Sequence, residues 1–181
     1  IYRRLDDTFL DPKVFNKNSL IGVPGLFKCW KKGNVGIINA LGTGVADDKA
    51  VYSYVNKMIV YYLGEQPILN QVETFLCEDK VHRQHVIENI SKLVVKPANA
   101  SGGYGIMIGP KAPKKEREEV IKKNKKNPRD FVAQPLEILS TTPTISENGI
   151  EPRHLDLRPF VLNGKSTYVT TGGLTRVALR K

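Results

Sequence analysis

The spacing of apolar residues predicts a helix in the first half of the chain. Between Ala46 and Tyr61 the apolar positions recur every three or four residues, which places them on one helix face. They are Val51, Tyr54, Val55, Met58 and Ile59. A short apolar run at 35–40 precedes this stretch, and Gly42 and Gly44 lie between the two. The pattern predicts a buried strand, a glycine turn and a helix, and a second helix over 79–89.

Beyond Lys92 the pattern changes to short apolar runs separated by glycine and proline, which predicts strands. The first two are Leu93–Pro97 and Ile106–Gly109, on either side of a glycine-rich loop at 101–105. A charged helical stretch, Lys111–Arg129, follows them. Phe131–Gln134 is a further predicted strand, which Pro135 ends.

The C-terminal part predicts a hairpin. A polar, turn-rich stretch at 140–149 leads to two strand patterns, His154–Leu162 and Thr167–Thr171, with Asn163-Gly164 as a favoured turn between them. A last strand is predicted at Leu174–Leu179. Helices combined with hairpins indicate the α+β class. The longest apolar run, Met58–Leu63, is far shorter than the ~18 residues of a membrane span, so we expect no membrane partner.

The net charge is large, but most of it lies in one stretch of the chain. The chain carries 28 Lys+Arg against 18 Asp+Glu, a net charge of +10, which is typical of proteins that bind polyanions. The stretch 111–129 alone holds nine basic residues and three glutamates, so it accounts for six of the ten charges. Because no aromatic residue is interleaved for base stacking, we expect a solvated helix and not a nucleic-acid site.

The chain begins at Ile1 without an initiator Met or a signal sequence, so we expect a piece of a longer protein. Its two cysteines, Cys29 and Cys77, are too far apart to indicate a metal knuckle or a disulfide framework. A reducing, cytoplasmic location is therefore expected.

Two glycine patterns fail the spacing tests for known phosphate loops. Gly42-Thr43-Gly44 starts like a dinucleotide fingerprint, but Asp47 occupies the place of the third glycine. A P-loop ends in Gly-Lys-Ser/Thr and opens a helix, whereas Gly103-Tyr104-Gly105 leads into a strand.

The remaining pattern is a glycine-rich loop after a strand that ends in a lysine. The strand lysine is Lys96, and the loop is Ser101, Gly102, Gly103, Tyr104 and Gly105. A half-buried ammonium needs an anionic partner, and glycine amides can donate to the oxygens of a polyphosphate. The alternative is an ordinary hairpin whose lysine extends its ammonium to solvent.

A second constellation lies on the predicted strand 154–162. Strand alternation places His154, Asp156 and Arg158 on one face. Arg158 is suited to clamp phosphate oxygens, and Asp156 either to hold Mg²⁺ or to orient the arginine. Arg176 is a further candidate phosphate ligand, and the alternative is an exposed ion pair.

Two weaker signals remain. We interpret His82 and His85 as surface residues, because no further ligand pattern accompanies them. The charged segment Tyr2–Asp7 is either a substrate contact or a surface cluster of ion pairs.

Taken in order, the motifs resemble those of ATP-grasp enzymes, most closely the circularly permuted, glutathionylspermidine-synthase-like branch. They are Tyr2–Pro12, Gly22–Leu26, Asn39–Ala50, Val95–Pro97 with Ser101–Gly105, His154–Phe160 and Gly172–Ala178. Almost the whole chain is covered by this resemblance.

The resemblance implies two small α+β lobes that hold ATP, after a strand-turn-helix segment. It implies a pre-grasp segment at 1–85, a lobe with the glycine-rich flap at 86–135 and a truncated second lobe at 136–181. The implied reaction transfers the γ-phosphoryl group to a carboxylate, and an amine then attacks the acyl phosphate.

The resemblance also implies roles for individual residues. Lys49 and Lys96 would contact the nucleotide, and residues 101–105 would form the flap that closes over it. The hinge that contacts adenine would comprise Gln134, Pro135, Leu136 and the neighbouring Glu137. Arg158 and Arg176 would stabilise the transferred phosphoryl group.

Two departures from the family pattern are visible. The hinge has Gln134-Pro135 where an acidic residue is common, with Glu137 as the nearest acid. The main Mg²⁺ ligands of the family are expected beyond Lys181, which leaves Asp156 as the one candidate metal ligand.

The leading hypothesis is therefore an ATP- and Mg²⁺-dependent carboxylate-amine ligase fragment that acts on a peptide-like substrate and has little activity alone. The carboxylate, the amine and the oligomeric state stay unassigned. The alternatives are a noncatalytic basic module for nucleic acid or an acidic partner, and a degenerate ATP-grasp protein.

Overall fold

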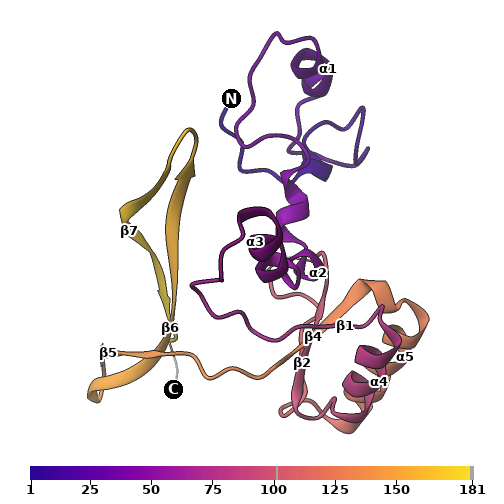
Figure 1. The fold of residues 1–181 in the computed structure, drawn as a ribbon, viewed down its shortest axis with the longest axis vertical. Coiled ribbons are helices and arrows are strands. Elements are labelled where there is room, and N and C mark those ends of the chain that lie inside the picture. Colours follow the sequence, from indigo (N-terminus) through magenta and orange to yellow (C-terminus); the bar gives the residue numbers. More distant parts are fainter. Residues whose placement is uncertain (101, 180–181) are drawn as a thin grey trace. The chain divides into compact units, whose positions relative to one another are not determined.

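The computed structural model describes residues 1–100 and 102–179 and divides into two units, Ile1–Leu136 and Glu137–Lys181 (Figure 1). The first unit contains helices and a sheet, and the second is a sheet alone. The predicted α+β class is confirmed. In the described part of the chain, the helices are too short or too polar to cross a lipid bilayer.

Four antiparallel strands form the sheet of the first unit. In chain order they are β1 (Phe75–Leu76), β2 (Leu93–Pro97), β3 (Met107–Ile108) and β4 (Phe131–Pro135). Their order in the sheet is β1-β4-β2-β3. In the central pair, Val94 lies opposite Gln134 and Lys96 opposite Val132. The strands predicted at 93–97 and 131–134 are thus confirmed.

The core of this unit lies on one face of the sheet. It contains Cys77, Val86, Ile90, Leu93, Val95, Met107 and Ala133, and side chains of α5 (Lys114–Lys126) pack against it. Because side chains alternate along a strand, burial of Leu93, Val95 and Ala133 on this face places Lys96 and Gln134 on the other. The sheet face opposite the core therefore carries the candidate lysine.

Helix α4 (Lys80–Glu88) confirms the helix predicted over 79–89. The Asp79 carboxylate accepts the N–H groups of Val81 at 2.8 Å and His82 at 2.9 Å, which caps the first turn. Both histidines, His82 and His85, pack on the ring of Phe75. The ring nitrogen Nδ1 of His82 also accepts the N–H of Leu76 at 3.2 Å.

Helix α5 has the solvated character that its sequence predicts. All of its lysines are exposed, and Lys114 lies 4.0 Å from the Glu118 carboxylate. Val120 and Ile121 are the side chains that reach the core. Four of the six excess charges of the stretch 111–129 thus belong to this surface helix, and Lys111 and Arg129 lie outside it.

The first part of the chain departs from the predicted strand, turn and helix. The stretch 35–40 forms no strand. Within it, Ile38 pairs with Tyr2 in an isolated bridge, and one paired residue is too few to make a strand. The predicted helix over 46–61 is divided into a 3-10 helix (Thr43–Asp47), α2 (Lys49–Tyr52) and α3 (Val55–Leu63). Asp48 has an extended backbone and caps Ala50, so it starts a new helix instead of continuing the old one.

The second unit is a three-stranded antiparallel sheet of β5 (Thr141–Ser146), β6 (Gly149–Asn163) and β7 (Thr167–Val177). The hairpin at 163–167 is confirmed, but the polar stretch 140–149 contains a strand where we predicted turns. The separate strand predicted at 174–179 is also wrong, since β7 continues through Gly172 and Gly173. A Cβ at Gly173 would lie 2.8 Å from the Arg158 carbonyl oxygen, so this close pairing requires glycine.

A buried carboxylate, Asp11, stabilises the region before α1 (Leu26–Lys31). It accepts three backbone N–H groups, from Lys13 at 2.9 Å and from Gly25 and Phe27 at 3.0 Å. The last two donors belong to the start of α1. Burial raises the pKa of Asp11, but the three hydrogen bonds outweigh it and leave the pKa below its ordinary value of 3.8.

Substitution Asp11→Ala is expected to lower the free energy of unfolding at pH 7 by about 3 kcal/mol, because three buried donors lose their acceptor. The pKa of Asp11 is lower in the folded protein than in the unfolded chain. Its contribution to the free energy of unfolding is therefore complete above the pKa of the unfolded chain, and it disappears as the pH falls through the pKa of the folded protein. The difference between the two proteins should therefore shrink below about pH 4.

Urea unfolding at pH 7 and pH 3 measures this difference. Asp47→Ala is the control, since Asp47 is exposed and has no protein partner in the described ranges. Equal destabilisation by the two substitutions would contradict the role of Asp11.

Candidate functional site

A cavity of about 690 Å³ lies in the first unit, at the end of β2. Most of its lining comes from three segments, residues 3–7, the stretch from Thr43 to Lys49, and the loop that follows β2, and Asn39 adds to it. Among the predicted site residues, Lys49, Gly102, Gly103 and Tyr104 line this cavity. The fold thus brings together a lysine and a glycine loop that lie far apart in the sequence.

The glycine loop has a backbone that only glycine adopts readily. Gly102, Gly103 and Gly105 have φ values of +73°, +80° and +71°, in the left-handed region. Residues 102–105 form a turn. Tyr104 is 82% exposed. Ser101, also predicted as part of this loop, lies outside the described residues.

Lys49 begins α2 and is attached to the segment between β2 and the glycine loop. Its backbone N–H donates to the Ala98 carbonyl at 2.9 Å. Its ammonium donates to the Ala100 carbonyl at 2.6 Å. Arg129 lies 3.6 Å from the Asp48 carboxylate, which caps this helix. The position of Lys49 at the cavity is therefore set by main-chain contacts as well as by its side chain.

Lys96 lies on β2, just before the cavity-lining Pro97. Its ammonium donates to the side-chain oxygen Oε1 of Gln134 at 2.6 Å. Burial, and to a smaller extent the positive charge of Lys49, lowers the pKa of Lys96 below the ordinary lysine value. Both effects disfavour the charged form of Lys96, so a bound anion near its ammonium would be stabilising.

The segment Tyr2–Asp7 contains a buried and an exposed arginine. Arg3 is 8% exposed and bonds to the main chain of Leu5, Asn39 and Ala40, so it anchors the segment. The neighbouring Arg4 is exposed and lines the cavity. The ion pair between Arg3 and Asp7 is thus part of a buried anchor, and a substrate contact by this segment stays a prediction.

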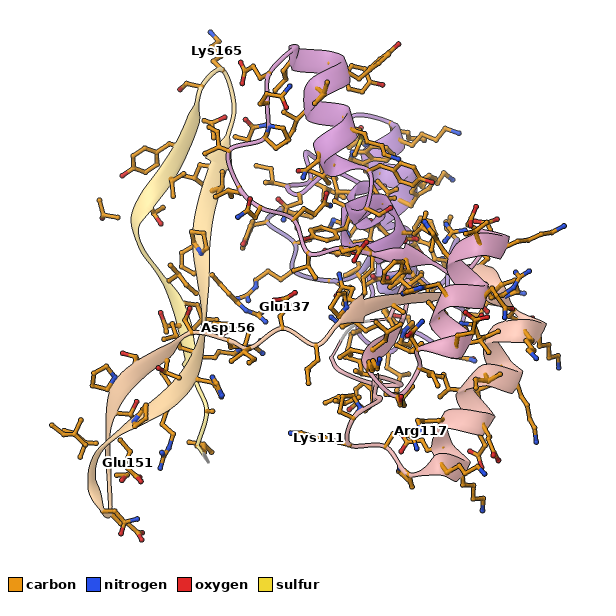
Figure 2. The ribbon with its side chains drawn as sticks, turned by 60° about the horizontal axis from the view of Figure 1, so that its bottom comes forward. Lys111, Arg117, Glu137, Glu151, Asp156 and Lys165 are labelled. Carbon is orange, nitrogen blue, oxygen red and sulfur yellow. The ribbon has the colours of Figure 1, made fainter. Side chains whose placement is uncertain are left out.

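The predicted hinge residues follow one another at the end of β4. Pro135 lies opposite Leu93 in the sheet, whereas Leu136 is 46% exposed. The side chain of Gln134 is already engaged, by Lys96 and by the hydroxyl of Thr74 at 2.9 Å. Glu137 lies on the irregular segment after β4 (Figure 2). The role of these residues as an adenine hinge remains a prediction.

In the second unit, Asp156, Arg158 and Arg176 form one cluster. Asp156 lies at the middle of β6 (Figure 2), directly opposite Arg176 on β7. Arg176 donates to Asp156 through Nε, at 3.1 Å to each carboxylate oxygen, and through Nη2 at 2.5 Å. Arg158 lies 3.4 Å from the same carboxylate. These hydrogen bonds from Arg176 lower the pKa of Asp156 to about 2.

These contacts bear on the two cofactors that the resemblance implies. The glycine-rich loop and the two lysines suit the phosphates of a nucleotide. For Mg²⁺, the described ranges contain no group of three His, Cys, Asp or Glu side chains suited to hold a metal ion. The carboxylate of Asp156 already accepts from two arginines, so it orients them in this structure.

Two residues at the site were not predicted from the sequence. Thr74 has no motif around it, and its contact with Gln134 spans sixty residues of chain. Asn99 lines the cavity, but a lone asparagine after a strand is an ordinary turn residue.

Comparison with known proteins adds independent information. The family model of circularly permuted ATP-grasp type 2 matches residues 1–178. An uncharacterised protein of Synechocystis sp. is 52% identical over 100% of this chain and 38% of its own length. An uncharacterised protein of Mycobacterium tuberculosis is 50% identical over 99% of this chain and 33% of its own length.

More distant similarities include a putative glutamate–cysteine ligase of Frankia casuarinae, 43% identical over 98% of this chain and 21% of its own length. A crystal structure of D-alanine–D-alanine ligase from Bacillus anthracis matches 85% of this chain and 49% of that chain, with 16% identity and a TM-score of 0.36. The chain spans about a third of the length of its two most similar relatives named above. Because the family model matches nearly all of its sequence, the chain belongs to the circularly permuted ATP-grasp type 2 family.

Proposed function

We propose that this chain is the ATP-binding part of a ligase that joins a carboxylate to an amine. The observation that carries the proposal is the glycine loop at 102–105, because its residues Gly102, Gly103 and Tyr104 line the same cavity as Lys49. Such a loop is suited to phosphate oxygens, because glycine amides can donate to them without a Cβ in the way. Lys96 and Lys49 supply the positive charge that a triphosphate needs.

In the proposed reaction, a carboxylate oxygen attacks the γ-phosphorus of ATP, and the bond between that phosphorus and the ADP oxygen breaks. An amine then attacks the carbonyl carbon of the acyl phosphate, loses a proton and displaces inorganic phosphate. The protein's contribution is to hold the phosphates in place and to stabilise their charge.

The roles of the second unit belong to the same proposal. Arg158 and Arg176 stabilise the transferred phosphoryl group, and Asp156 holds both guanidinium groups in a defined orientation. The backbone of residues 134–137 contacts the adenine. The name of the Frankia relative, a putative glutamate–cysteine ligase, supports amino-acid-like or peptide-like substrates.

Calorimetry with ATP and ADP, in the presence of Mg²⁺, tests this proposal. We expect weak binding, of about millimolar affinity, which corresponds to roughly 4 kcal/mol. Gly103→Ala is expected to weaken the binding about fivefold, because a Cβ strains a residue at φ +80° and displaces the loop.

Gly33→Ala is the matched control. Gly33 has φ +75°, and at neither glycine would a Cβ meet another atom within 4 Å. The two substitutions thus cause similar backbone strain, but Gly33 does not line the cavity. A folded wild-type sample that binds neither ATP nor ADP would refute the proposal. Equal nucleotide affinities of Gly103→Ala and Gly33→Ala would show that the loop does not contribute to binding.

A further inference from the structure

The ammonium of Lys96 has a neutral partner where a charged one would be expected. Lys96 is half-buried, and its hydrogen bond is to the amide oxygen of Gln134. No carboxylate of the described residues lies within ion-pair distance of it. A half-buried cation with only an amide partner keeps most of its charge for another ligand.

The orientation of the Gln134 amide is determined by a hydrogen-bonded relay. The hydroxyl of Thr74 donates to the Val72 carbonyl at 3.0 Å, which uses its single hydrogen. Its oxygen can then only accept, and it accepts from Nε2 of Gln134 at 2.9 Å. With Nε2 directed at Thr74, Oε1 must face Lys96.

The relay follows from the sheet register. Gln134 lies opposite Val94 on β2, and Lys96 is two residues further along the same strand, so the two are diagonal neighbours on one face. On the other side of β4, Phe75 lies opposite Ala133, which places Thr74 beside Gln134. Three separate segments thus contribute one side chain each.

We propose that Gln134, oriented by Thr74, is a positioning residue that directs the uncompensated ammonium of Lys96 toward a phosphate group of the nucleotide. This inference rests on the proposed function, and it adds a reason why a neutral amide is needed at this position. A glutamate would have almost the same shape but would form an ion pair with Lys96 and withdraw its charge from the ligand.

Two substitutions test the two halves of this inference. Gln134→Glu is expected to weaken ATP binding about tenfold, because the new carboxylate neutralises Lys96 and repels the phosphates. Thr74→Val removes the acceptor that orients the amide and is expected to weaken ATP binding about threefold. Thr74→Ser keeps the hydroxyl and should restore wild-type affinity.

The readout is calorimetric affinity for ATP and for adenosine, which lacks phosphates. Gln134→Glu and Thr74→Val should lose affinity for ATP and keep their affinity for adenosine. A merely structural defect would lower both affinities. Gln66→Glu, at an exposed glutamine, is the control for the added charge. It should bind ATP as the wild type does.

The failure of this inference is separable from that of the proposed function. If the wild type binds ATP and both Gln134→Glu and Thr74→Val bind it equally well, the positioning role is refuted while nucleotide binding stands. If the wild type binds no nucleotide, both are refuted. If Gln134→Glu does not fold, the Thr74→Val and Thr74→Ser pair decides alone.

Discussion

Substitution Lys96→Ala is expected to lower the affinity for ATP about a hundredfold, which in a weakly binding protein removes measurable binding. A charge-assisted hydrogen bond to an anion contributes roughly 2–3 kcal/mol, and each 1.4 kcal/mol is about a factor of ten in affinity. The loss is expected to be large because Lys96 is half-buried and, among the described residues, its side chain is bonded to the neutral Gln134 alone.

Lys92→Ala is the matched control for this substitution. Lys92 is exposed and directly precedes β2, so its replacement changes the net charge equally without touching the cavity. Calorimetry with ATP measures both variants, and circular dichroism shows that they are folded. An affinity of Lys96→Ala within threefold of the control would exclude the proposed role of Lys96.

Substitution Arg3→Ala is expected to lower the free energy of unfolding of the first unit by about 3–5 kcal/mol, the range for breaking a buried ion pair. Arg3 is 8% exposed and donates to the carbonyls of Asn39 at 2.7 Å, Leu5 at 2.8 Å and Ala40 at 2.6 Å. Its guanidinium also lies 2.7 Å from the Asp7 carboxylate. Removing it takes a charged donor from all four acceptors, although the Ala40 carbonyl keeps the hydroxyl of Thr43 and Asp7 keeps the N–H groups of Gly42 and Gly44.

Arg4→Ala isolates this effect, because Arg4 is the adjacent residue with the same charge but is exposed. Its replacement should change stability by less than about 0.5 kcal/mol. Arg3→Lys should recover little, since a single ammonium cannot reproduce the several fixed donors of a guanidinium. Urea unfolding followed by circular dichroism compares the three variants. Equal midpoints for Arg3→Ala and Arg4→Ala would show that Arg3 is not an anchor.

These experiments separate stability from binding within one segment. Arg3 and Asp7 stabilise the segment 2–7 against the stretch 39–44, and Asp7 accepts the N–H groups of Gly42 and Gly44 at 3.2 Å. All four of these charged residues line the cavity, but Arg4 and Asp6 are exposed. Because adjacent residues have different surroundings here, a scan of this segment should show alternating losses of stability and of binding.

Elements with a strong local signal were predictable from the sequence. Helix α4 follows the capping residue Asp79, and β2 and β4 are apolar runs between turn residues, so local preference and burial favour the same structure. The loop at 102–105 was predictable because its glycines adopt positive φ values that other residues rarely do.

Where the local signal was ambiguous, the prediction failed. From the sequence, Asp48 could lie within one long helix or could end one helix and cap the next. In the structure its backbone is extended, and it caps α2. The segment 141–146 is rich in threonine, which is typical both of turns and of strands. Pairing with residues 149–154 determined that it is β5.

What the sequence determined by itself is the α+β class, the family expected from the order of its motifs, and the side chains available for phosphate binding. Only the tertiary structure decided how those side chains meet. The Lys96–Gln134 contact spans 38 residues and depends on the register of β2 and β4, and the Gln134–Thr74 contact spans 60 and depends on the register of β1 and β4. Register is a property of paired strands, so a pattern read along one segment cannot contain it.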